Sequence, residues 1–324
     1  MEQDCGSVTP ERGGRILTQT APSSLEDQAG IPNTGQRKTA TSPTLPGISV
    51  KRALPFLKWA GGKGQLLDQL SPHFPKAFNR YFEPFLGSAS VYFFLRNNRP
   101  QFAATLIDAN ADLINCFEMV KEDLDGLLPL LRNYQRRHAE NFYYKTREQK
   151  PASLGRLERA ARFIYLNKTC YNGLYRVNKS GAFNVPIGSY PKPKIFDEDN
   201  LRAVSEALQG TTLLCAHFSK VLAYAHKGDL VYFDPPYFTE TNGFTSYAVS
   251  ASGRTDFTAG DHKMLERNVA DLIERGCKVV VSNSDTQFIR RLYKQSKVHV
   301  VAARRYINCN GSGRGRVEEL VITG

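Results

Sequence analysis

The sequence predicts an α/β fold: a doubly wound, mostly parallel sheet with helices on both faces. Short apolar runs such as ATLID at 104–108, LVYFD at 230–234 and CKVVVSN at 277–283 each end in polar or turn residues, as buried strands do. An amphipathic helical pattern, ANADLINCFEMVK, follows the first of these runs directly. The chain can also bury a large core, because 41% of its 324 residues are hydrophobic. Strands that alternate with helices favour parallel pairing.

The beginning of the chain is predicted to be a disordered tail. Residues 1–50 contain no aromatic residue, and 23 of these 50 residues are Gly, Pro, Ser or Thr. Such a segment buries too little apolar surface to offset the conformational entropy that folding removes. Order is therefore expected from about residue 51, in three parts that span residues 51–122, 123–200 and 201–324.

The first part of the core opens with LPFLKWAGGKGQLLDQL at 54–70. Its Gly61–Gly62 pair predicts a turn, and a helix is expected next because the leucines at 66, 67 and 70 share one face. The run RYFEPFLG at 80–87 then predicts a strand that ends in a turn.

The middle part, residues 123–200, departs from this alternation. Its pattern is helical from Asp123 to about Lys168, and LYRVNKSGAFNV at 174–185 predicts a hairpin that turns at Asn178–Gly181. The segment Leu131–Ile195 holds fourteen Lys and Arg against three Asp and Glu. Positive charge concentrated in a folded region predicts a polyanion partner, above all a nucleic acid. We therefore expect a small helical subdomain with a protruding hairpin, inserted between two halves of the sheet.

The last part, residues 201–324, is expected to complete the sheet. Gly276 is predicted to end a helix just before the strand CKVVVSN. The runs KVHVVAARRYI at 297–307 and RVEELVITG at 316–324 are expected to pair as a closing antiparallel hairpin.

Several classes of protein are disfavoured by the composition. The longest apolar runs, such as VYFFL, are much shorter than the roughly 18 residues of a membrane-spanning helix. The start MEQDCGSV lacks the pattern of a secretory signal, so a cytoplasmic protein is expected. The six cysteines are widely separated, and neither they nor the six histidines show the spacing of a metal site. We expect reduced thiols and no metal.

A candidate cofactor turn lies in EPFLGSAS at 83–90. Gly87 allows a ligand to approach the backbone, and a helix that starts after it would present free N–H groups. Asp108 follows 21 residues later, the spacing at which nucleotide-binding α/β units present a carboxylate to ribose hydroxyls. The alternative is that Asp108 only caps the helix that starts near Asn110. A dinucleotide fingerprint needs three spaced glycines and is absent, which disfavours NAD.

A candidate catalytic motif lies in GDLVYFDPPYF at 228–238. Two prolines end strand pairing after Asp234, so the Asp234 carboxylate and the Pro235 carbonyl provide two hydrogen-bond acceptors at the rim of the sheet. Both lie beside the aromatic ring of Tyr237. An exocyclic amino group on a flat heterocycle has two N–H donors and a π face, and it matches this arrangement.

Four motifs together resemble the DNA adenine-N6 methyltransferases of the Dam type, which methylate adenine in GATC. They are FLKWAGGKGQLL at 56–67, EPFLGSAS at 83–90, NKTCYNGLYRVNKSGAFNVPIGSY at 167–190 and DPPY at 234–237. The resemblance covers about Leu54 to Gly324. It implies a Rossmann-like methyltransferase core whose cofactor region is 51–122 and whose catalytic region is 201–324, with a DNA target-recognition subdomain at 123–200.

The resemblance also implies site residues, S-adenosylmethionine as the cofactor and a target adenine that is flipped out of the duplex. Catalysis is assigned to Asp234, Pro235, Pro236 and Tyr237. Cofactor binding is assigned to Trp59, Lys63, Phe85, Gly87, Asp108 and Asp234. DNA binding is assigned to Lys58, Tyr171, Asn172, Leu174, Arg176, Asn184 and Pro186. Within this DNA set, Arg176 is expected to read a guanine, and Lys58 to contact the first guanine of the site.

The expected partner is double-stranded DNA, with no membrane and with the protein acting as a monomer in a bacterial cytoplasm or encoded by a phage. Alternatives stay open from the sequence: a catalytically silent DNA-binding protein of the same fold, or a methyltransferase of cytosine N4 or of RNA. Ser189 stands where the family places a basic residue, which puts one phosphate contact in doubt. The sequence does not decide between a regulatory or repair enzyme, a phage enzyme and half of a restriction system.

Overall fold

The computed structural model describes residues 51–99, 102–178, 180–238, 257–304 and 316–324. These ranges belong to one compact unit, Ser49–Gly324. The predicted disordered tail at 1–50 lies outside the described residues, and so does most of the loop expected between the last two strands.

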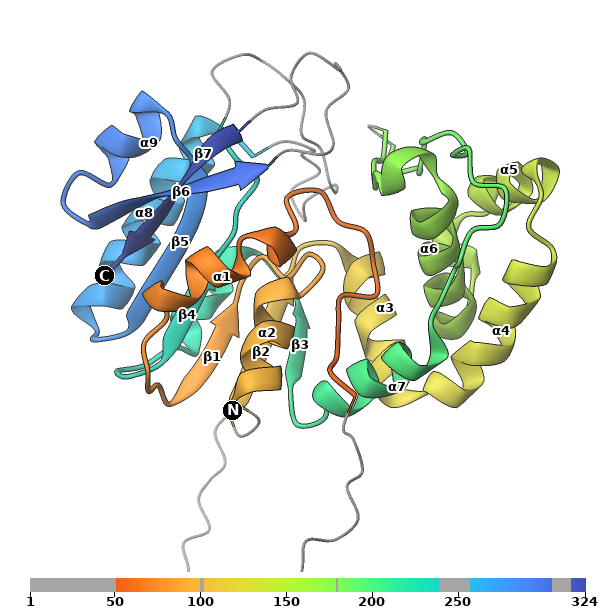
Figure 1. Cartoon of the computed structure of the whole chain (residues 1–324), viewed down its shortest axis with the longest axis horizontal. Helices are drawn as coiled ribbons and strands as arrows, with labels where there is room; N and C mark the ends of the chain where they lie inside the picture. Colours follow the sequence, from red (N-terminus) through yellow and green to blue (C-terminus); the bar gives the residue numbers. More distant parts are fainter. Residues whose placement is uncertain (1–50, 100–101, 179, 239–256, 305–315) are drawn as a thin grey trace, which may run out of the picture. The chain divides into compact units, whose positions relative to one another are not determined.

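A seven-stranded sheet forms the centre of this unit, in the order β3-β2-β1-β4-β5-β7-β6 (Figure 1). Pairing is parallel from β3 to β5, whereas β7 pairs antiparallel with both β5 and β6. The strands are β1 Arg80–Glu83, β2 Ala103–Asp108, β3 Thr212–Cys215, β4 Leu230–Phe233, β5 Lys278–Ser284, β6 Lys297–Arg304 and β7 Arg316–Thr323. The predicted α/β fold and the closing antiparallel hairpin are confirmed.

The order of the strands reverses between β1 and β4. From β1 the chain continues outward to β2 and β3, whereas from β4 it continues in the opposite direction to β5. In open α/β sheets the crevice at the carboxyl ends of two such strands is the usual place of a ligand site. The segments that leave β1 and β4 are those that carry Gly87 and Asp234.

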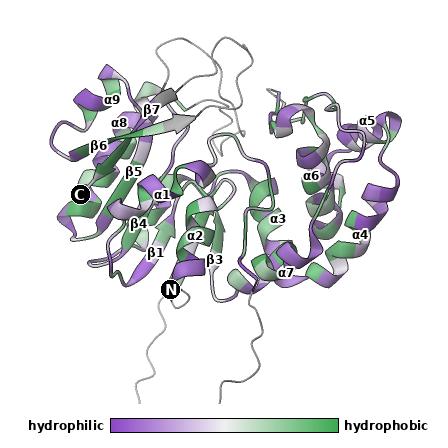
Figure 2. Ribbon diagram, in the orientation of Figure 1, coloured by the Kyte–Doolittle hydropathy of each residue, from purple (hydrophilic) through white to green (hydrophobic). Residues whose placement is uncertain are grey.

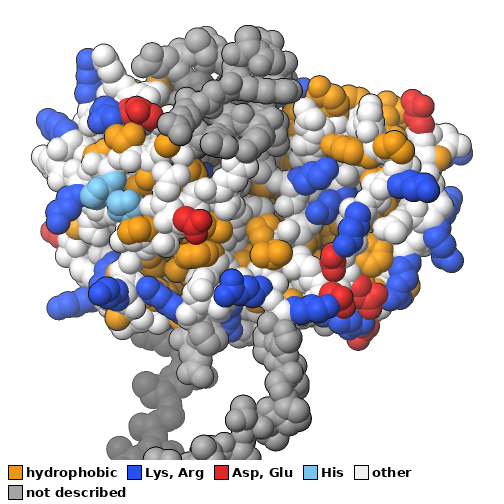
Figure 3. Space-filling model, in the orientation of Figure 1, with side chains coloured by type: hydrophobic (Ala, Val, Ile, Leu, Met, Phe, Trp, Pro, Cys, Tyr) orange, Lys and Arg blue, Asp and Glu red, His pale blue; other side chains and the backbone are white. Residues whose placement is uncertain are grey.

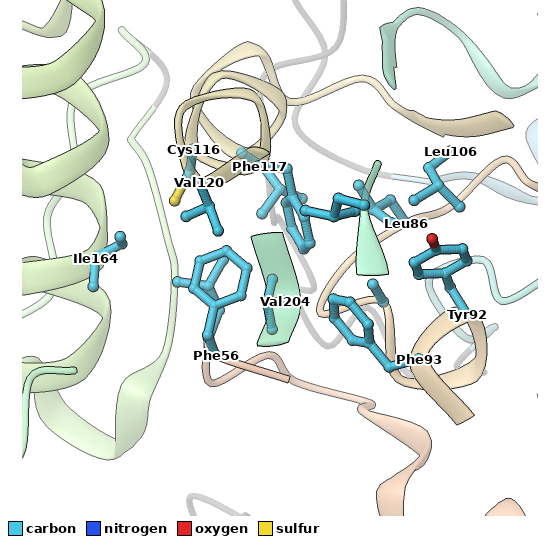
Figure 4. Close-up of a cluster of buried hydrophobic side chains, with 14 of the residues drawn as sticks. Phe56, Leu86, Tyr92, Phe93, Leu106, Cys116, Phe117, Val120, Ile164 and Val204 are labelled. Atoms are coloured by element: carbon cyan, nitrogen blue, oxygen red, sulfur yellow. The ribbon is translucent and has the colours of Figure 1, made fainter. Parts of the chain in front are cut away.

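Helices cover both faces of the sheet, each over its own apolar core (Figure 2). Alternate residues of one strand supply the two cores, as Tyr81 and Phe82 of β1 show. On the first face lie α2 Ser90–Asn98, α3 Ala111–Glu122 and α7 Glu198–Ala207, with Phe56, Phe93, Phe117 and Val204 among the packed side chains (Figure 4). On the second face lie η5 Phe218–Ala223, α8 Ala259–Glu274 and α9 Gln287–Leu292.

The predicted helical insertion is present as α4 Leu124–Arg136, α5 Glu140–Glu148 and α6 Arg156–Thr169. Helix α6 packs on α3 of the core and on α4 and α5, as Figure 1 shows at its right side. The same apolar cluster runs through this interface, with Ile164 of α6 beside the core residues Cys116 and Val120 in Figure 4. The insertion is thereby joined to the sheet through α3.

The remaining elements are short. They are η1 Lys63–Gln65, α1 Leu67–Leu70, η2 Ser71–His73, η3 Pro151–Ser153 and η4 Tyr171–Gly173. The helix predicted after Gly61–Gly62 is therefore broken into single turns. Pro72 lies in η2. Proline is tolerated in the first turn of a helix, but it prevents an earlier helix from continuing through its position.

Within the described ranges, no helix has the length and apolar character of a membrane span. In the same ranges, no group of three or more His, Cys, Asp and Glu side chains is arranged to hold a metal ion.

Candidate active site

The first part of the site is the turn that leaves β1. Gly87 has φ +48°, in the left-handed region that glycine adopts without steric cost. Its N–H donates to Oδ2 of Asp108 at 3.2 Å, and Oδ1 of Asp108 accepts from the N–H of Asn110 at 2.9 Å. Burial raises the pKa of the Asp108 carboxyl to about 6, although these backbone N–H groups act against the rise. The two residues that the spacing singled out are thus in direct contact.

Helix α3 is capped by another residue than Asp108. The Asn110 side chain accepts hydrogen bonds from the N–H groups of Asp112 and Leu113, at 3.0 and 3.1 Å. Because Asn110 supplies the cap, the alternative that Asp108 serves only as a cap is wrong. The Asp108 carboxylate instead tightens the turn at Gly87.

Helix α2 begins just after this turn without a side-chain cap. Its N-cap residue, Ala89, is itself left-handed with φ +58° and makes no side-chain hydrogen bond to the helix. The first N–H groups of a helix have no partners inside the helix, so they are available to a polar or anionic ligand. The expected helix N-terminus beside Gly87 is therefore present.

Trp59 lies against the same turn. A Cβ atom placed on Gly87 would come within 2.8 Å of Trp59 Cδ1, so the indole occupies the space that the missing side chain leaves. Trp59 also stacks with Tyr175, at a distance of 5.7 Å between the ring centroids. Trp59 thereby connects the turn after β1 with the beginning of the hairpin in the insertion.

Phe85 lies in an aromatic group on the other side of this turn. Its ring stacks on Phe218 at 5.2 Å and meets Phe257 edge-on at 5.6 Å. Phe85 is half-buried, so part of its ring is left for an apolar or flat ligand.

The second part of the site is the motif that leaves β4, where pairing with β5 ends at Phe233. Asp234 follows, and its Oδ1 lies 2.7 Å from Nζ of Lys63. Nζ also donates to the carbonyl of Gly61 at 2.7 Å, and the Lys63 side chain is only 3% exposed. Burial raises the pKa of the Asp234 carboxyl to about 6, and the ammonium of Lys63 limits the rise.

Tyr237 is fixed by two charged groups. Its hydroxyl donates to Oε2 of Glu319 on β7 at 2.5 Å, and Lys63 Nζ lies 4.8 Å from the centroid of its ring. Burial, together with the charges of Asp234 and Glu319, raises the pKa of the phenol well above its ordinary value. Tyr237 therefore stays protonated and acts as a donor.

The predicted hairpin of the insertion is present, although as isolated bridges and not as two continuous strands. Val177 pairs with Phe183, and the chain turns at Asn178, whose N–H donates to the carbonyl of Ala182 at 2.9 Å. Next to this bridge, on the side away from the turn, Arg176 Nε donates to Oδ1 of Asn184 at 2.8 Å. Two residues of the predicted DNA-binding set thus hold one another.

The rest of the predicted DNA-binding set lies at the base of the hairpin. Tyr171 and Asn172 are exposed, and the Tyr171 N–H donates to the carbonyl of Pro186 at 2.9 Å. Leu174 is half-buried and Pro186 is exposed. Lys58 is joined to α6 because its backbone N–H and C=O pair with the side chain of Asn167, at 2.8 and 2.7 Å.

Comparison with known proteins decides the family. A profile described as "D12 class N6 adenine-specific DNA methyltransferase" matches residues 59–307. The chain belongs to this family. It is an adenine-specific DNA methyltransferase, as the resemblance implied, and the site above is its candidate active site.

Relatives of this methyltransferase are similar over nearly their whole length. Type II methyltransferase M.MjaIII of Methanocaldococcus jannaschii is 41% identical over 287 residues, which cover 83% of this chain and 98% of the relative. A DNA adenine methylase of Vibrio cholerae is 37% identical over 278 residues, 84% of this chain and 96% of the relative. A DNA adenine methylase of Escherichia coli is 37% identical over 276 residues, 84% and 95% of the two chains.

In this methyltransferase the structure brings the predicted cofactor and catalytic residues to one rim of the sheet. Gly87 and Asp108 are in contact, as are Lys63 and Asp234, and Trp59 covers Gly87. The roles of the individual site residues stay predictions, including those of Pro235 and Pro236.

Sequence reasoning missed the residues that hold the predicted ones. They are Asn110, Asn167, Tyr175 and Glu319. Two of them had a signal in the sequence. Asn110 is a preferred N-cap residue at the expected start of a helix, and Glu319 is a charged residue within the strand pattern RVEELVITG.

Proposed function

We propose that this enzyme transfers the methyl group of S-adenosylmethionine to N6 of adenine in GATC sites of double-stranded DNA, with the target adenine flipped out of the duplex. The observation that carries the proposal is the Lys63–Asp234 ion pair of 2.7 Å at the carboxyl end of β4, next to Tyr237 and to the turn after β1. The family membership fixes adenine and DNA. The cofactor, the base flipping and the GATC site are parts of the proposal.

The residues around Gly87 suit S-adenosylmethionine. The missing side chain of Gly87 leaves room for the indole of Trp59, the N-terminus of α2 offers N–H groups, and Asp108 provides a carboxylate for ribose hydroxyls. Phe85 and Trp59 add aromatic surface for a flat ring. When bound, this cofactor supplies an electrophilic methyl group. Trp59, Lys63, Phe85, Gly87 and Asp108 are the residues that we expect to hold it.

Asp234 is suited to orient the adenine amine. Lys63 engages its Oδ1, so Oδ2 is the oxygen that we assign to one N–H of the amine. The Pro235 carbonyl is assigned to the other N–H. Two such bonds aim the nitrogen lone pair away from the ring, and the amine becomes acidic only as the new bond to carbon forms. Asp234 therefore acts first by orientation.

The insertion is suited to hold duplex DNA. Its excess positive charge attracts phosphates, and Arg176 presents the guanidinium group that reads guanine by two hydrogen bonds in the major groove. Asn184 limits the orientations of this guanidinium. With the resemblance of this hairpin to GATC enzymes, these contacts support GATC as the site. The ring of Tyr237 is assigned to stacking on the flipped adenine.

The proposal is tested with labelled S-adenosylmethionine and a set of duplexes in which each base of GATC is varied in turn. We expect label on adenine N6 of the intact site and little on any variant. Asp234→Asn should lower the rate by about 100-fold or more, because the amide cannot accept and orient in the same way as the carboxylate.

A matched control is Asp271→Asn, which changes an exposed carboxylate that pairs with Arg275 on α8. This variant should keep the wild-type rate. The Asp234→Asn variant, although slow in methylation, should still bind the duplex. Normal turnover of Asp234→Asn, or equal labelling of the varied duplexes, would contradict the proposal.

A further inference from the structure

The bond between Tyr237 and Glu319 joins the catalytic motif to the strand β7. Tyr237 follows β4, and Glu319 lies 82 residues later in the chain. Glu319 is 9% exposed, whereas its neighbour Glu318 is exposed. A buried carboxylate is costly unless hydrogen bonds compensate it, and the next residues along the strand, Leu320 and Val321, are buried and apolar. The carboxylate at position 319 therefore calls for an explanation other than packing.

The position of Glu319 is fixed on both sides by the sheet. β7 lies between β5 and β6, and Glu319 is opposite Ser284 of β5 and Val301 of β6. Because both edges of the strand are paired, the backbone at this position has little freedom to shift. The carboxylate is thus a firm anchor for whatever it binds.

The bond itself has a defined direction. The phenol of Tyr237 remains protonated, so it donates and the Glu319 oxygen accepts, at 2.5 Å. Hydrogen bonds to a charged acceptor are among the strong ones. This bond restrains rotation about the Cα–Cβ bond of Tyr237 and so fixes where the ring lies.

The ring of Tyr237 in turn has a cation beside it. Lys63 Nζ lies 4.8 Å from the ring centroid and 2.7 Å from Asp234 Oδ1. Polar groups in contact thus run from the Glu319 carboxylate, through the neutral phenol and the ammonium of Lys63, to the Asp234 carboxylate. If the Tyr237 ring were displaced, the surface that we expect to stack on adenine would move, and Lys63 of the ion pair would lose the ring beside it.

We propose that Glu319 is a positioning residue for methyl transfer, which acts from β7 by holding the ring of Tyr237 in place. The inference rests on the proposed function, because it takes the motif at 234–237 as the catalytic one. Glu319 itself need not touch the substrate. Its effect passes through the Tyr237 hydroxyl, which gives the proposal a specific test.

The test compares four variants by methylation kinetics on a GATC duplex. Glu319→Leu removes the acceptor and should lower kcat about 10- to 100-fold, with the KM for the duplex changed by less than about threefold. Glu319→Gln keeps an oxygen that can accept from the phenol and should restore most of kcat. Tyr237→Phe removes the hydroxyl but keeps the ring and should resemble Glu319→Leu. Glu318→Leu is the matched control on the same strand and should be normal.

The decisive measurement is the double variant. If Glu319 acts through the phenol, Glu319→Leu in the Tyr237→Phe background should lower kcat by less than about twofold more. Melting temperatures of all variants distinguish a loss of positioning from a loss of folded protein. Glu319→Gln and Tyr237→Phe change the volume of the buried side chains little, so we expect these two variants to fold. A normal kcat in Glu319→Leu, full additivity in the double variant, or failure of Glu319→Gln to restore kcat would overturn the proposal.

The two proposals fail in different ways. An active Asp234→Asn variant would overturn the assignment of the catalytic motif. An inactive Asp234→Asn variant together with a normal Glu319→Leu variant would overturn only the role of Glu319.

Discussion

Lys63 is the residue on which the geometry of the candidate active site converges. The resemblance assigned it to the cofactor, yet its ammonium contacts the Asp234 carboxylate, the Gly61 carbonyl and the face of the Tyr237 ring. An ammonium with 3% exposure needs such partners, because burial without them would be very unfavourable. The positive charge also favours the ionised form of Asp234, which is the form that accepts hydrogen bonds from an amine.

The carboxyl of Asp234 makes the expected rate dependent on pH. Its pKa is about 6, so we expect kcat/KM for the duplex to rise with pH through a midpoint of about 6 and to level off at higher pH. The carboxyl is protonated below this pH, and it then accepts more weakly from the amine and carries an O–H donor of its own. A pH–rate profile between pH 5 and 8 on the GATC duplex measures the midpoint.

The groups that face Asp234 decide in which direction the midpoint moves. Lys63 lowers the pKa of Asp234, and Glu319 raises it. Glu319→Gln should therefore move the midpoint to lower pH, whereas the exposed control Glu318→Gln should leave it unchanged. A flat profile from pH 5 to 8, or a midpoint that rises in Glu319→Gln, would contradict this account.

Among the elements, the hairpin of the insertion and the turn after β1 are joined by an aromatic stack. Tyr175 begins the hairpin, Trp59 lies between, and Gly87 has the open backbone against which the indole packs. Arg176 follows Tyr175 directly in the chain. The element that we expect to read DNA is thus built onto the element that we expect to hold the cofactor.

Arg176 of this hairpin is expected to determine the preference for guanine. Arg176→Ala should lower the preference for the cognate guanine by about 1–3 kcal/mol, because one good two-bond contact to guanine is worth that much. Methylation rates on GATC and on duplexes with one guanine replaced measure the loss. Arg132→Ala, which removes an exposed arginine paired with Glu198, is the control and should keep the preference. An unchanged preference in Arg176→Ala would remove this residue from the recognition set.

Elements with a strong local signal were predictable from the sequence. β4 and β5 are apolar and end in turn or polar residues, and the helical insertion repeats an apolar face. β3 was not predicted, since it is an edge strand of only four residues, all of them exposed or half-buried. α7 was also missed, although the Asp197 side chain caps it by accepting a hydrogen bond from the Asn200 N–H.

The contacts within the candidate site could be predicted only in part. The pairing of Gly87 with Asp108 followed from spacing along one strand–helix unit. The partners of Asp234 and Tyr237 did not, because Lys63 and Glu319 come from segments far away in the chain, the turn η1 and the strand β7, which only the tertiary fold brings near. Single-sequence patterns report which face a residue takes, and not which distant residue it meets.

The whole molecule carries its positive charge unevenly. The net charge is +12, and fourteen Lys and Arg lie in Leu131–Ile195 with only three Asp and Glu. Figure 3 shows Lys and Arg side chains on the surface of the helical part at the right of the view. We expect such a distribution to attract the phosphates of DNA and to orient the insertion toward it.

The positive charge of the insertion predicts that DNA binding depends strongly on salt concentration. The affinity for duplex DNA should fall steeply with salt, by about 10³- to 10⁵-fold between 50 and 200 mM if 6–10 phosphates are contacted. The rate at saturating DNA should change much less, since the buried Lys63–Asp234 pair is screened little. Binding titrations at several salt concentrations give the slope of log K against log salt. A slope shallower than about −2 would contradict a phosphate-based attachment.

The place of β7 inside the sheet has a consequence for biosynthesis. β7 is the last of the seven strands in the chain, yet it lies between β5 and β6. A nascent chain that has been synthesised as far as β6 therefore contains the DPPY motif but lacks the strand with which β6 pairs. It also lacks the anchor of Tyr237. Premature stops or frameshifts shortly before residue 316 should thus yield polypeptides that contain the whole DPPY motif but an unfinished sheet. The strand that completes this sheet is synthesised after the other six.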